Sequence, residues 1–456
     1  MAQQAADTAV GGRGGMFGAW QDGGAPLIAR AEGIRLWDVD GKEYIDATSG
    51  AIAVISVGHG RQEVIEAMAE QGRKFSYVQG GRFAHDVAAE LARELARFTP
   101  GDLNRAIFVS GGSEANETAI KLARAYQLLR GNPQRHLVLS RKRSYHGNTL
   151  GALAVSGYGP RREPYEPLLL QIPKVREVNF YRDGDGMSPE EYALLCANDL
   201  ERAIHQAGPE RVSAFIAEPI VGAAGAATTP PPGYFERIRE ICDQYDILFI
   251  ADEVITGLGR TGRNFGIDHW GVAPDIIVTA KGLAGGYAPL GAVLVSERID
   301  ELFREAGQGF IHGYTYMAHP VSCAAGLAVL RIIEREGLVA NAAEQGAALF
   351  AQLAHLAAEH PLIGDIRGKG LLAGIELVAD REKKAPLDPA LGVSMRLVRA
   401  ALRHGITVYP CQTGPGHSDQ FLVSPPLIAT ADDIEEIVNR LSLALDDVEA
   451  ELRALT

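Results

Sequence analysis

The chain has 456 residues, of which 46% are hydrophobic, so it can bury a large core and is not a disordered protein. Its 44 basic and 57 acidic residues give a net charge of −13, which disfavours nucleic acid as a partner. No apolar run reaches membrane-spanning length, the four cysteines form no CxxC pair, and residues 1–15 lack the apolar core of a signal peptide. We therefore expect a soluble, cytoplasmic protein with a loose tail at 1–15, without a membrane partner.

The first two thirds of the chain predict a hairpin followed by alternating strands and helices. Strand-like residues flank Asp40-Gly41 and predict a β-hairpin within residues 33–46. Short runs rich in Val and Ile then alternate with amphipathic stretches such as 113–129 and 233–245. This alternation predicts an α/β fold with a mostly parallel sheet and helices on both faces. The predicted strands are Ala106–Ser110, Leu137–Ser140, Ala214–Ala217, Ile247–Ala251, Ile276–Thr279 and Ala292–Val295.

The pattern changes after about residue 330. A long helix, a strand, a helix, a strand and a terminal helix near Ala431–Leu455 follow one another. This order predicts a separate α+β unit. The polar stretches Asn179–Met187 and Ala379–Pro389 are predicted to be surface loops.

Polar and glycine residues follow five of the predicted strands. In an open parallel sheet, ligands bind beyond the carboxyl ends of the strands, so these residues are expected to share one rim. Each has a purely structural interpretation: Ser113 as a helix N-cap, Asp252 as a turn residue, Lys281 as a surface lysine. Five such coincidences together favour a functional site. The residues are Gly111-Gly112-Ser113, Tyr145-His146, Glu218, Asp252-Glu253 and Lys281-Gly282.

The chemistry of this rim indicates one type of ligand. Gly112 and Ser113 open a helix, whose N-terminal N–H groups bind phosphate. Asp252 directly follows an apolar run, where a carboxylate is costly without a cation. Lys281 is followed by several glycines, which allow close approach of the backbone to a ligand. A ligand that is phosphorylated, aromatic, cationic at one edge and reactive toward an amine fits all of these, and pyridoxal 5′-phosphate has these properties.

Long segments resemble the class III aminotransferases, which are pyridoxal-phosphate enzymes of fold type I. The resemblance covers nearly the whole chain and implies a large cofactor-binding domain, placed at 71–330. It also implies a smaller α+β domain built from both chain ends, 16–70 and 331–456. A homodimer with active sites at the subunit interface is implied, with a tetramer as the alternative. The segments are SGGSEANETAIKLAR (110–124), YHGNTLGAL (145–153), EPIVG (218–222), 251–293 and 312–330.

The resemblance also implies roles for individual residues. Lys281 corresponds to the Schiff-base lysine that moves the proton during catalysis. Asp252 corresponds to the partner of the ring nitrogen, and Tyr145 and Val254 to the residues on the two faces of the ring. Glu218 corresponds to an acid near the ring's 3-oxygen. The implied cofactor-binding set, which includes no metal ligand, is Gly112, Ser113, Tyr145, His146, Glu218, Asp252, Val254, Lys281 and, from the neighbouring subunit, Thr315.

Two departures from the family pattern bear on the keto-acid acceptor. Ala223 stands where glutamate users have a gating glutamate, and Leu422 where they have an arginine for the carboxylate. The stretch Gly286–Gly291 resembles the amine (ω-amino acid)–pyruvate branch. We therefore predict an ω-transaminase that moves an amino group from an amine or ω-amino acid to a keto acid, pyruvate, by a ping-pong mechanism.

Substrate-binding residues are less well defined by the sequence. Trp20 and Tyr77 match pocket-lining aromatic positions of that branch. Its mobile arginine has no clear counterpart between residues 409 and 420, so Arg82 and Arg367 are the candidate replacements.

Other reactions of the family remain as alternatives. A 2-oxoglutarate-dependent aminotransferase, a lyase, a decarboxylase and a racemase would share Lys281, Asp252 and the phosphate cradle. A single half-reaction separates a transaminase from the last three, because a transaminase leaves the cofactor in its pyridoxamine form. A regulatory module is disfavoured because the first thirty residues are too short for a DNA-binding appendage.

Overall fold

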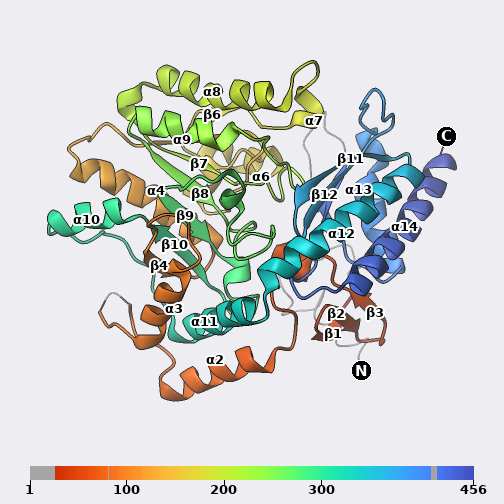
Figure 1. The fold of residues 1–456 in the computed structure, drawn as a ribbon, viewed down its shortest axis with the longest axis horizontal. Helices are drawn as coiled ribbons and strands as arrows, with labels where there is room; N and C mark the ends of the chain where they lie inside the picture. The colour runs from red at the N-terminus through yellow and green to blue at the C-terminus, as the bar shows by residue number, and fades with distance from the viewer. Residues whose placement is uncertain (1–25, 81, 412–418, 456) are drawn as a thin grey trace.

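A mostly parallel sheet runs through the middle of the protein, seen in a computed structural model that describes residues 26–80, 82–411 and 419–455 (Figure 1). Within the described chain its strand order is β4-β10-β9-β8-β7-β5-β6. Strands β6, β5, β7, β8 and β9 are parallel to one another, and β10 is antiparallel to β9 and to β4. The predicted α/β sheet is confirmed. Its strands are β4 (Arg105–Val109), β5 (Leu137–Arg141), β6 (Lys174–Val175), β7 (Val212–Ala217), β8 (Leu248–Asp252), β9 (Ile276–Thr279) and β10 (Gly291–Val295).

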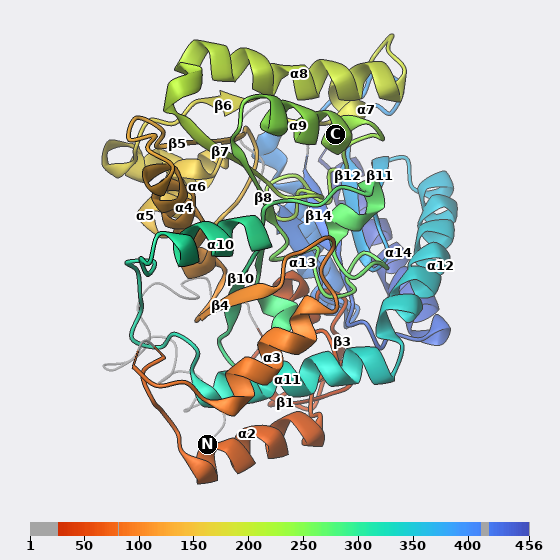
Figure 2. The same cartoon turned by 60° about the vertical axis from the view of Figure 1, so that its left-hand side comes forward.

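Helices cover both faces of this sheet because the inner strands are apolar on both sides. In β8, Leu248 and Ile250 pack toward α4, whereas Phe249 and Ala251 pack on the face that α9 covers. Helices α8 and α9 lie along the top of both views, and α4 and α10 lie toward the left (Figure 2). Below them, α11 packs against α2 and α3. The helices of this part of the chain are α2 (Gln62–Lys74), α3 (Asp86–Ala96), α4 (Gly112–Leu129), α5 (Leu150–Val155), α6 (Gly159–Arg162), α7 (Phe180–Asp183), α8 (Pro189–Ala207), α9 (Tyr234–Gln244), α10 (Glu297–Glu305) and α11 (Pro320–Arg335).

The first and last segments of the described chain lie side by side. The hairpin around Gly41 is formed by β2 and β3, and Gly41 has φ +84°. The N–H of Ile45 donates to the carbonyl of Gly405 at 2.8 Å, and Arg35 reaches Glu436 of α14 at 2.7 Å. The elements are β1 (Ile28–Glu32), β2 (Arg35–Asp38), β3 (Glu43–Ile45), α12 (Leu338–Glu359), β11 (Ile363–Lys369), β12 (Leu372–Leu377), α13 (Val393–Arg403), β13 (Tyr409–Cys411), β14 (Gln420–Val423) and α14 (Ala431–Arg453).

The domain boundaries at residues 70 and 330 stay a prediction. Both fall inside helices, α2 and α11, and these two helices pack against each other. None of the described helices combines the length and the apolar character that crossing a lipid bilayer requires.

Two expectations about local structure need correction. The predicted loop Asn179–Met187 contains the one-turn helix α7, because the Asn179 side chain caps it and Phe180 packs on Tyr192 with ring centroids 5.6 Å apart. The single strands expected on either side of α13 are each a pair, and the four strands form an antiparallel sheet of order β11-β12-β14-β13. The loop at Ala379–Pro389 is confirmed, since Asp380 and Ala385 close it through a short bridge.

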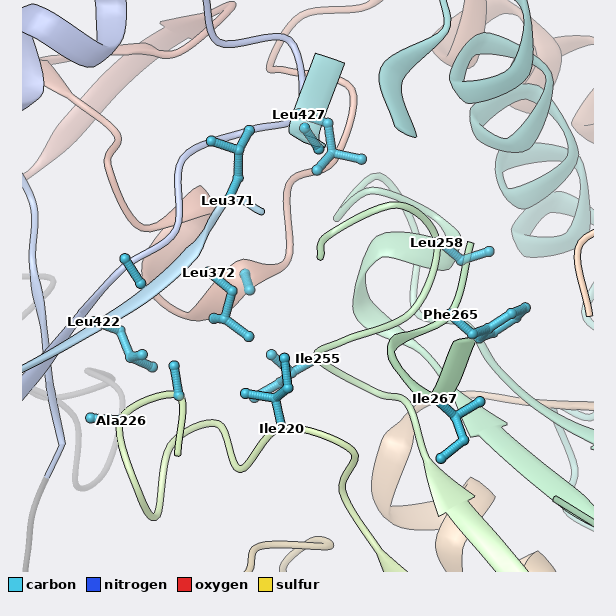
Figure 3. Packing of buried hydrophobic residues seen from close by; sticks show 14 of the residues in the cluster. Ile220, Ala226, Ile255, Leu258, Phe265, Ile267, Leu371, Leu372, Leu422 and Leu427 are labelled. Atoms are coloured by element: carbon cyan, nitrogen blue, oxygen red, sulfur yellow. The ribbon is translucent and has the colours of Figure 1, made fainter. Parts of the chain in front are cut away.

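An apolar contact joins the C-terminal sheet to the rim of the central sheet. Leu372 and Leu422 lie beside Ile220 and Ala226 of the loop that follows β7, in one continuous buried cluster (Figure 3). A buried guanidinium crosses the same region: Arg260 donates to the carbonyl oxygens of Leu371 and Pro425 and to Oγ of Ser49. Both chain ends are therefore held against the edge of the sheet where the predicted site residues lie.

Candidate active site

A cavity of about 410 Å³ lies at the carboxyl ends of the central strands. Strand β4 runs parallel to β9, because both are antiparallel to β10, so the residues that follow β4, β5, β7, β8 and β9 meet at one edge. The predicted rim is thereby confirmed as a place in the fold, while the roles of its residues stay a prediction. The lining includes Gly111, Gly112, Ser113, Asn116, Tyr145, His146, Glu218, Asp252, Val254, Ala280 and Lys281.

Asp252 is the last residue of β8 and is buried. Its Oδ2 atom accepts a hydrogen bond from Nδ2 of Asn116 at 2.9 Å and another from Nδ1 of His146 at 2.7 Å. Its Oδ1 atom accepts from the N–H of Val254 at 3.1 Å. These donors satisfy the buried carboxylate and hold it in one orientation. The backbone N–H of His146 in turn donates to Oγ of Ser156 at 2.8 Å, which fixes the position of His146.

Lys281 enters the cavity from the short turn of helix at Lys281–Leu283, directly beyond β9. Its backbone is left-handed, with φ +43°, a conformation that costs energy for a residue with a side chain. Burial lowers the pKa of its ammonium to about 8, although the negative charges of Asp252 and Glu218 act in the opposite direction and raise the pKa. A neutral amine is therefore far more accessible here than in an exposed lysine, and a neutral amine is a nucleophile and a base.

Glu218 follows β7 and is buried beside the cavity. Its carboxylate accepts from the N–H groups of Tyr145 and Gly222, each at 2.9 Å. Burial raises its pKa, and the charge of Asp252 raises it further. Glu218 thus fixes the backbone of Tyr145, whose ring forms part of the cavity wall.

The N-terminus of α4 forms the floor of the cavity. The structural interpretation of Ser113 as N-cap is wrong, because the helix begins at Gly112 and Gly111 occupies the cap position without a side-chain cap. A Cβ atom at Gly112 would lie 3.1 Å from Cγ1 of Val254, so glycine allows this close packing. The first N–H groups of α4 face a cavity rather than a capping side chain, which is the arrangement that binds phosphate.

Two buried polar atoms in the cavity wall lack a hydrogen-bond partner within the described protein. They are Oδ1 of Asn116 and Nε2 of His146. Buried polar atoms are rarely left unpaired, so they favour a polar ligand in this cavity. Together with the helix N-terminus, the buried carboxylate and the lysine, they fit a phosphorylated heteroaromatic aldehyde.

Other predicted residues lie outside the cavity lining. Thr315 is exposed, and its carbonyl oxygen accepts a hydrogen bond from the hydroxyl of Tyr77 at 2.7 Å. Tyr77 is itself 40% exposed. Arg82 is also exposed. Trp20 lies outside the described residues.

Arg367 and Leu422 belong to the C-terminal sheet rather than to the cavity wall. The Arg367 guanidinium pairs with Asp365 at 2.8 Å and with Glu376 at 2.6 Å, and it donates to the carbonyl of Ala226 at 2.9 Å. These partners leave it little capacity for a substrate carboxylate. Leu422 lies in β14 and is buried in the core.

Asn116 is a site residue that the sequence reasoning missed. It lies on α4 among the buried positions Ala115, Thr118, Ala119 and Leu122. A large amide on the buried stripe of a helix is costly unless it is paired, and that was the available signal.

Comparisons with known proteins agree with this geometry. The family model for Aminotransferase class-III matches residues 19–445. The chain is 36% identical to a putrescine–pyruvate aminotransferase of Pseudomonas aeruginosa, over 94% of this chain and 92% of that protein. It is 37% identical to a diaminobutyrate–2-oxoglutarate transaminase of Halomonas elongata, over 93% and 92%.

Solved structures give the same result. A thermostable (S)-enantioselective ω-transaminase from Thermomicrobium roseum superposes with a TM-score of 0.88 at 40% identity, covering 93% of each chain. An ω-transaminase from Pseudomonas jessenii in complex with PMP, the pyridoxamine form of the cofactor, has a TM-score of 0.87 at 36% identity, also covering 93% of each chain.

Proposed function

Since this chain belongs to the class III aminotransferases, which use pyridoxal 5′-phosphate to move amino groups from amines to keto acids, we propose that its donor is an amine or ω-amino acid and its acceptor is pyruvate. The observation that carries the proposal is that Lys281 and Asp252 share one cavity with the uncapped N-terminus of α4. A ping-pong mechanism follows, because one cavity must take the donor and the acceptor in turn.

The residues that would hold the cofactor follow from the cavity wall. Gly112 and Ser113 would bind its phosphate through the start of α4, and Tyr145 and Val254 would contact the faces of its ring. Asp252 would hold a proton on the ring nitrogen, because its donors keep the carboxylate in place and a nearby anion stabilises a cation.

When bound, the cofactor supplies an electron sink for the carbon that loses its proton. Nζ of Lys281 would attach the cofactor and, once released by the substrate amine, would take a proton from the substrate carbon and return it to the cofactor side. A pKa of about 8 suits both roles, because the amine is partly neutral near physiological pH.

The preference for pyruvate is supported by two apolar positions. Ala223 and Leu422 are both buried and lie outside the cavity lining, and at the positions where the family resemblance implies a glutamate and an arginine they offer no charged group to a second carboxylate. A buried carboxylate without a partner costs several kcal/mol, and each ~1.4 kcal/mol is tenfold in rate. Pyruvate avoids this cost because it has a single carboxylate. The 2-oxoglutarate-using relative makes 2-oxoglutarate the second candidate acceptor.

We also propose a homodimer, with Thr315 of the partner subunit at the cofactor phosphate. This proposal is supported by large apolar side chains left exposed around that segment, Ile311 at 99%, Phe83 at 62% and Tyr316 at 59%. A cytoplasmic location is proposed from the cysteines, since all four are buried free thiols, as is usual in reducing compartments.

Two measurements test the proposed function. The purified holoenzyme is mixed with one amine, and the cofactor spectrum is followed without acceptor; stable conversion to the pyridoxamine form is expected, whereas a return to the aldehyde form would indicate a lyase or racemase. The kcat/KM values for pyruvate and 2-oxoglutarate are then compared with the same donor. Pyruvate is expected to be better by at least roughly tenfold. Equal or better use of 2-oxoglutarate would overturn the acceptor assignment.

A further inference from the structure

Arg161 places a positive charge beside the wall of the cavity. It lies near the end of α6, and its Cζ atom is 5.1 Å from the ring centroid of Tyr145 and 5.8 Å from that of Tyr158. The two tyrosine rings meet edge to face, with centroids 6.2 Å apart. Because Tyr145 lines the cavity that contains Lys281, the guanidinium is one side chain removed from the substrate space.

The charge of Arg161 is not balanced by a protein carboxylate. Among the residues that the structure describes, no carboxylate oxygen lies within 4.0 Å of its guanidinium nitrogens. The adjacent Arg162 differs, because it pairs with Glu166 and its Nη1 atom donates to the carbonyl of Leu153. Arg367 is likewise committed to acidic partners. A partly buried guanidinium without an anion is therefore a candidate to bind an anionic group of a ligand.

Three tyrosines interact electrostatically with Arg161, and the rings of two of them, Tyr145 and Tyr158, lie within 6 Å of its Cζ atom. Burial raises the pKa of Tyr145, Tyr158 and Tyr409, to about 12 for Tyr158, while the charge of Arg161 acts on all three in the opposite direction. The hydroxyls are thus neutral at physiological pH and able to donate hydrogen bonds. A guanidinium accompanied by neutral hydroxyl donors is well suited to a carboxylate.

The charges inside the cavity favour such a cation. Asp252 and Glu218 both line it and would repel a substrate carboxylate. Burial lowers the pKa of Lys281, and the charges of Arg161 and Arg260 lower it further, so the field of Arg161 extends to the reacting amine. The segment 412–418, which follows Tyr409, contains no lysine or arginine.

We propose that Arg161, assisted by the hydroxyl of Tyr145, binds the carboxylate of the keto-acid acceptor and determines the preference for substrates that carry one. This inference rests on the proposed transaminase function. Arg161 acts on substrate binding and takes no part in proton transfer at Lys281.

The test separates the two half-reactions of the holoenzyme. Wild type, Arg161→Gln and Arg161→Lys are first converted with 1-phenylethylamine, which has no carboxylate, and then reacted with pyruvate or with butanal, which also has none. Arg161→Gln is expected to raise the apparent KM for pyruvate at least about tenfold, with the butanal and amine reactions within about twofold of wild type. Arg161→Lys should recover part of the pyruvate affinity. Arg304→Gln, an exposed arginine of α10, should match wild type.

Calorimetric titration of each holoenzyme with propanoate supplies a readout that does not depend on turnover. Arg161→Gln should weaken propanoate binding at least about tenfold, and Arg161→Met, which keeps the packing on Tyr145, should do the same if the glutamine variant is poorly folded. Unchanged pyruvate KM, or an equal loss with pyruvate and butanal, would overturn the proposal. If the wild type converts no amine, the proposed function fails, while the propanoate titration still decides on Arg161.

Discussion

The amide of Asn116 donates to Oδ2 of Asp252 at 2.9 Å, and the same nitrogen donates to the carbonyl of His146 at 2.7 Å. One side chain on α4 therefore joins the end of β8 to the loop after β5. The carboxylate that would face the cofactor ring is positioned by a helix whose N-terminus would, in our proposal, bind the cofactor phosphate.

Asn116→Ala should weaken cofactor binding without removing the carboxylate. A lost hydrogen bond to a buried charged group costs about 1–3 kcal/mol, or roughly 5- to 150-fold in the dissociation constant of pyridoxal 5′-phosphate. Fluorescence titration of the apoprotein with pyridoxal 5′-phosphate measures this dissociation constant. Asn198→Ala, at an exposed position of α8, is the control and should leave the dissociation constant unchanged. An unchanged constant for Asn116→Ala would show that His146 and the N–H of Val254 suffice to hold Asp252.

Lys281 should react with the cofactor at a rate that rises with pH. Its ammonium has a pKa lowered to about 8 by burial, and the neutral amine is the reactive form. The rate of reconstitution of apoprotein with pyridoxal 5′-phosphate is expected to increase through a midpoint near pH 8 and then level off. Stopped-flow absorbance measures the profile. Borohydride reduction followed by peptide mapping should place the cofactor on Lys281, and its recovery on a different lysine would contradict the assignment.

Glu253 should make the protein less stable as the pH rises. Its buried carboxylate accepts from the N–H groups of Gly266 and Ile267, and burial raises its pKa from 4.5 to about 7. The stability contributed by the protonated form is complete below about pH 4.5 and is lost as the pH rises through about 7. The difference in unfolding free energy between wild type and Glu253→Gln should therefore fall by about 3 kcal/mol between pH 4 and pH 8.

Urea unfolding at a series of pH values measures this difference. The glutamine variant cannot titrate at this position, so every other ionisable group cancels in the comparison. A difference independent of pH would show that Glu253 keeps the same protonation state in the folded and unfolded chain.

Arg260 should stabilise the attachment of both chain ends to the central sheet. It is buried and donates to the carbonyls of Leu371 and Pro425 and to Oγ of Ser49. Arg260→Ala leaves these acceptors unpaired and should lower the free energy of unfolding by about 2–4 kcal/mol. Arg263→Ala, three residues on and exposed, is the matched control and is expected to change it by less than about 0.5 kcal/mol. Equal effects of the two variants would exclude a role for the buried guanidinium.

The sequence alone determined the central sheet and the rim of the cavity. Runs such as Ile276–Thr279 are apolar on both faces, which suits strands covered by helices on both sides. Parallel strands bring their carboxyl ends to one edge, so the positions of Asp252 and Lys281 directly after two such runs are enough to place them together. The hairpin at Gly41 was equally predictable, because a left-handed turn residue is a local requirement.

The tertiary structure decided which charged side chains have a partner of opposite charge within the described protein and which have none. Arg161 and Arg367 look equivalent in the sequence. Arg367 is paired because β12 brings Glu376 next to it across an antiparallel sheet, whereas Arg161 meets aromatic rings and no described carboxylate. Asn116 and Arg260 became informative for the same reason, since Asp252 and Leu371, to which they donate, lie more than a hundred residues away from them. Local sequence specifies strands, turns and helix ends, whereas the partner of a buried charge depends on how distant segments pack, and no local pattern encodes that packing.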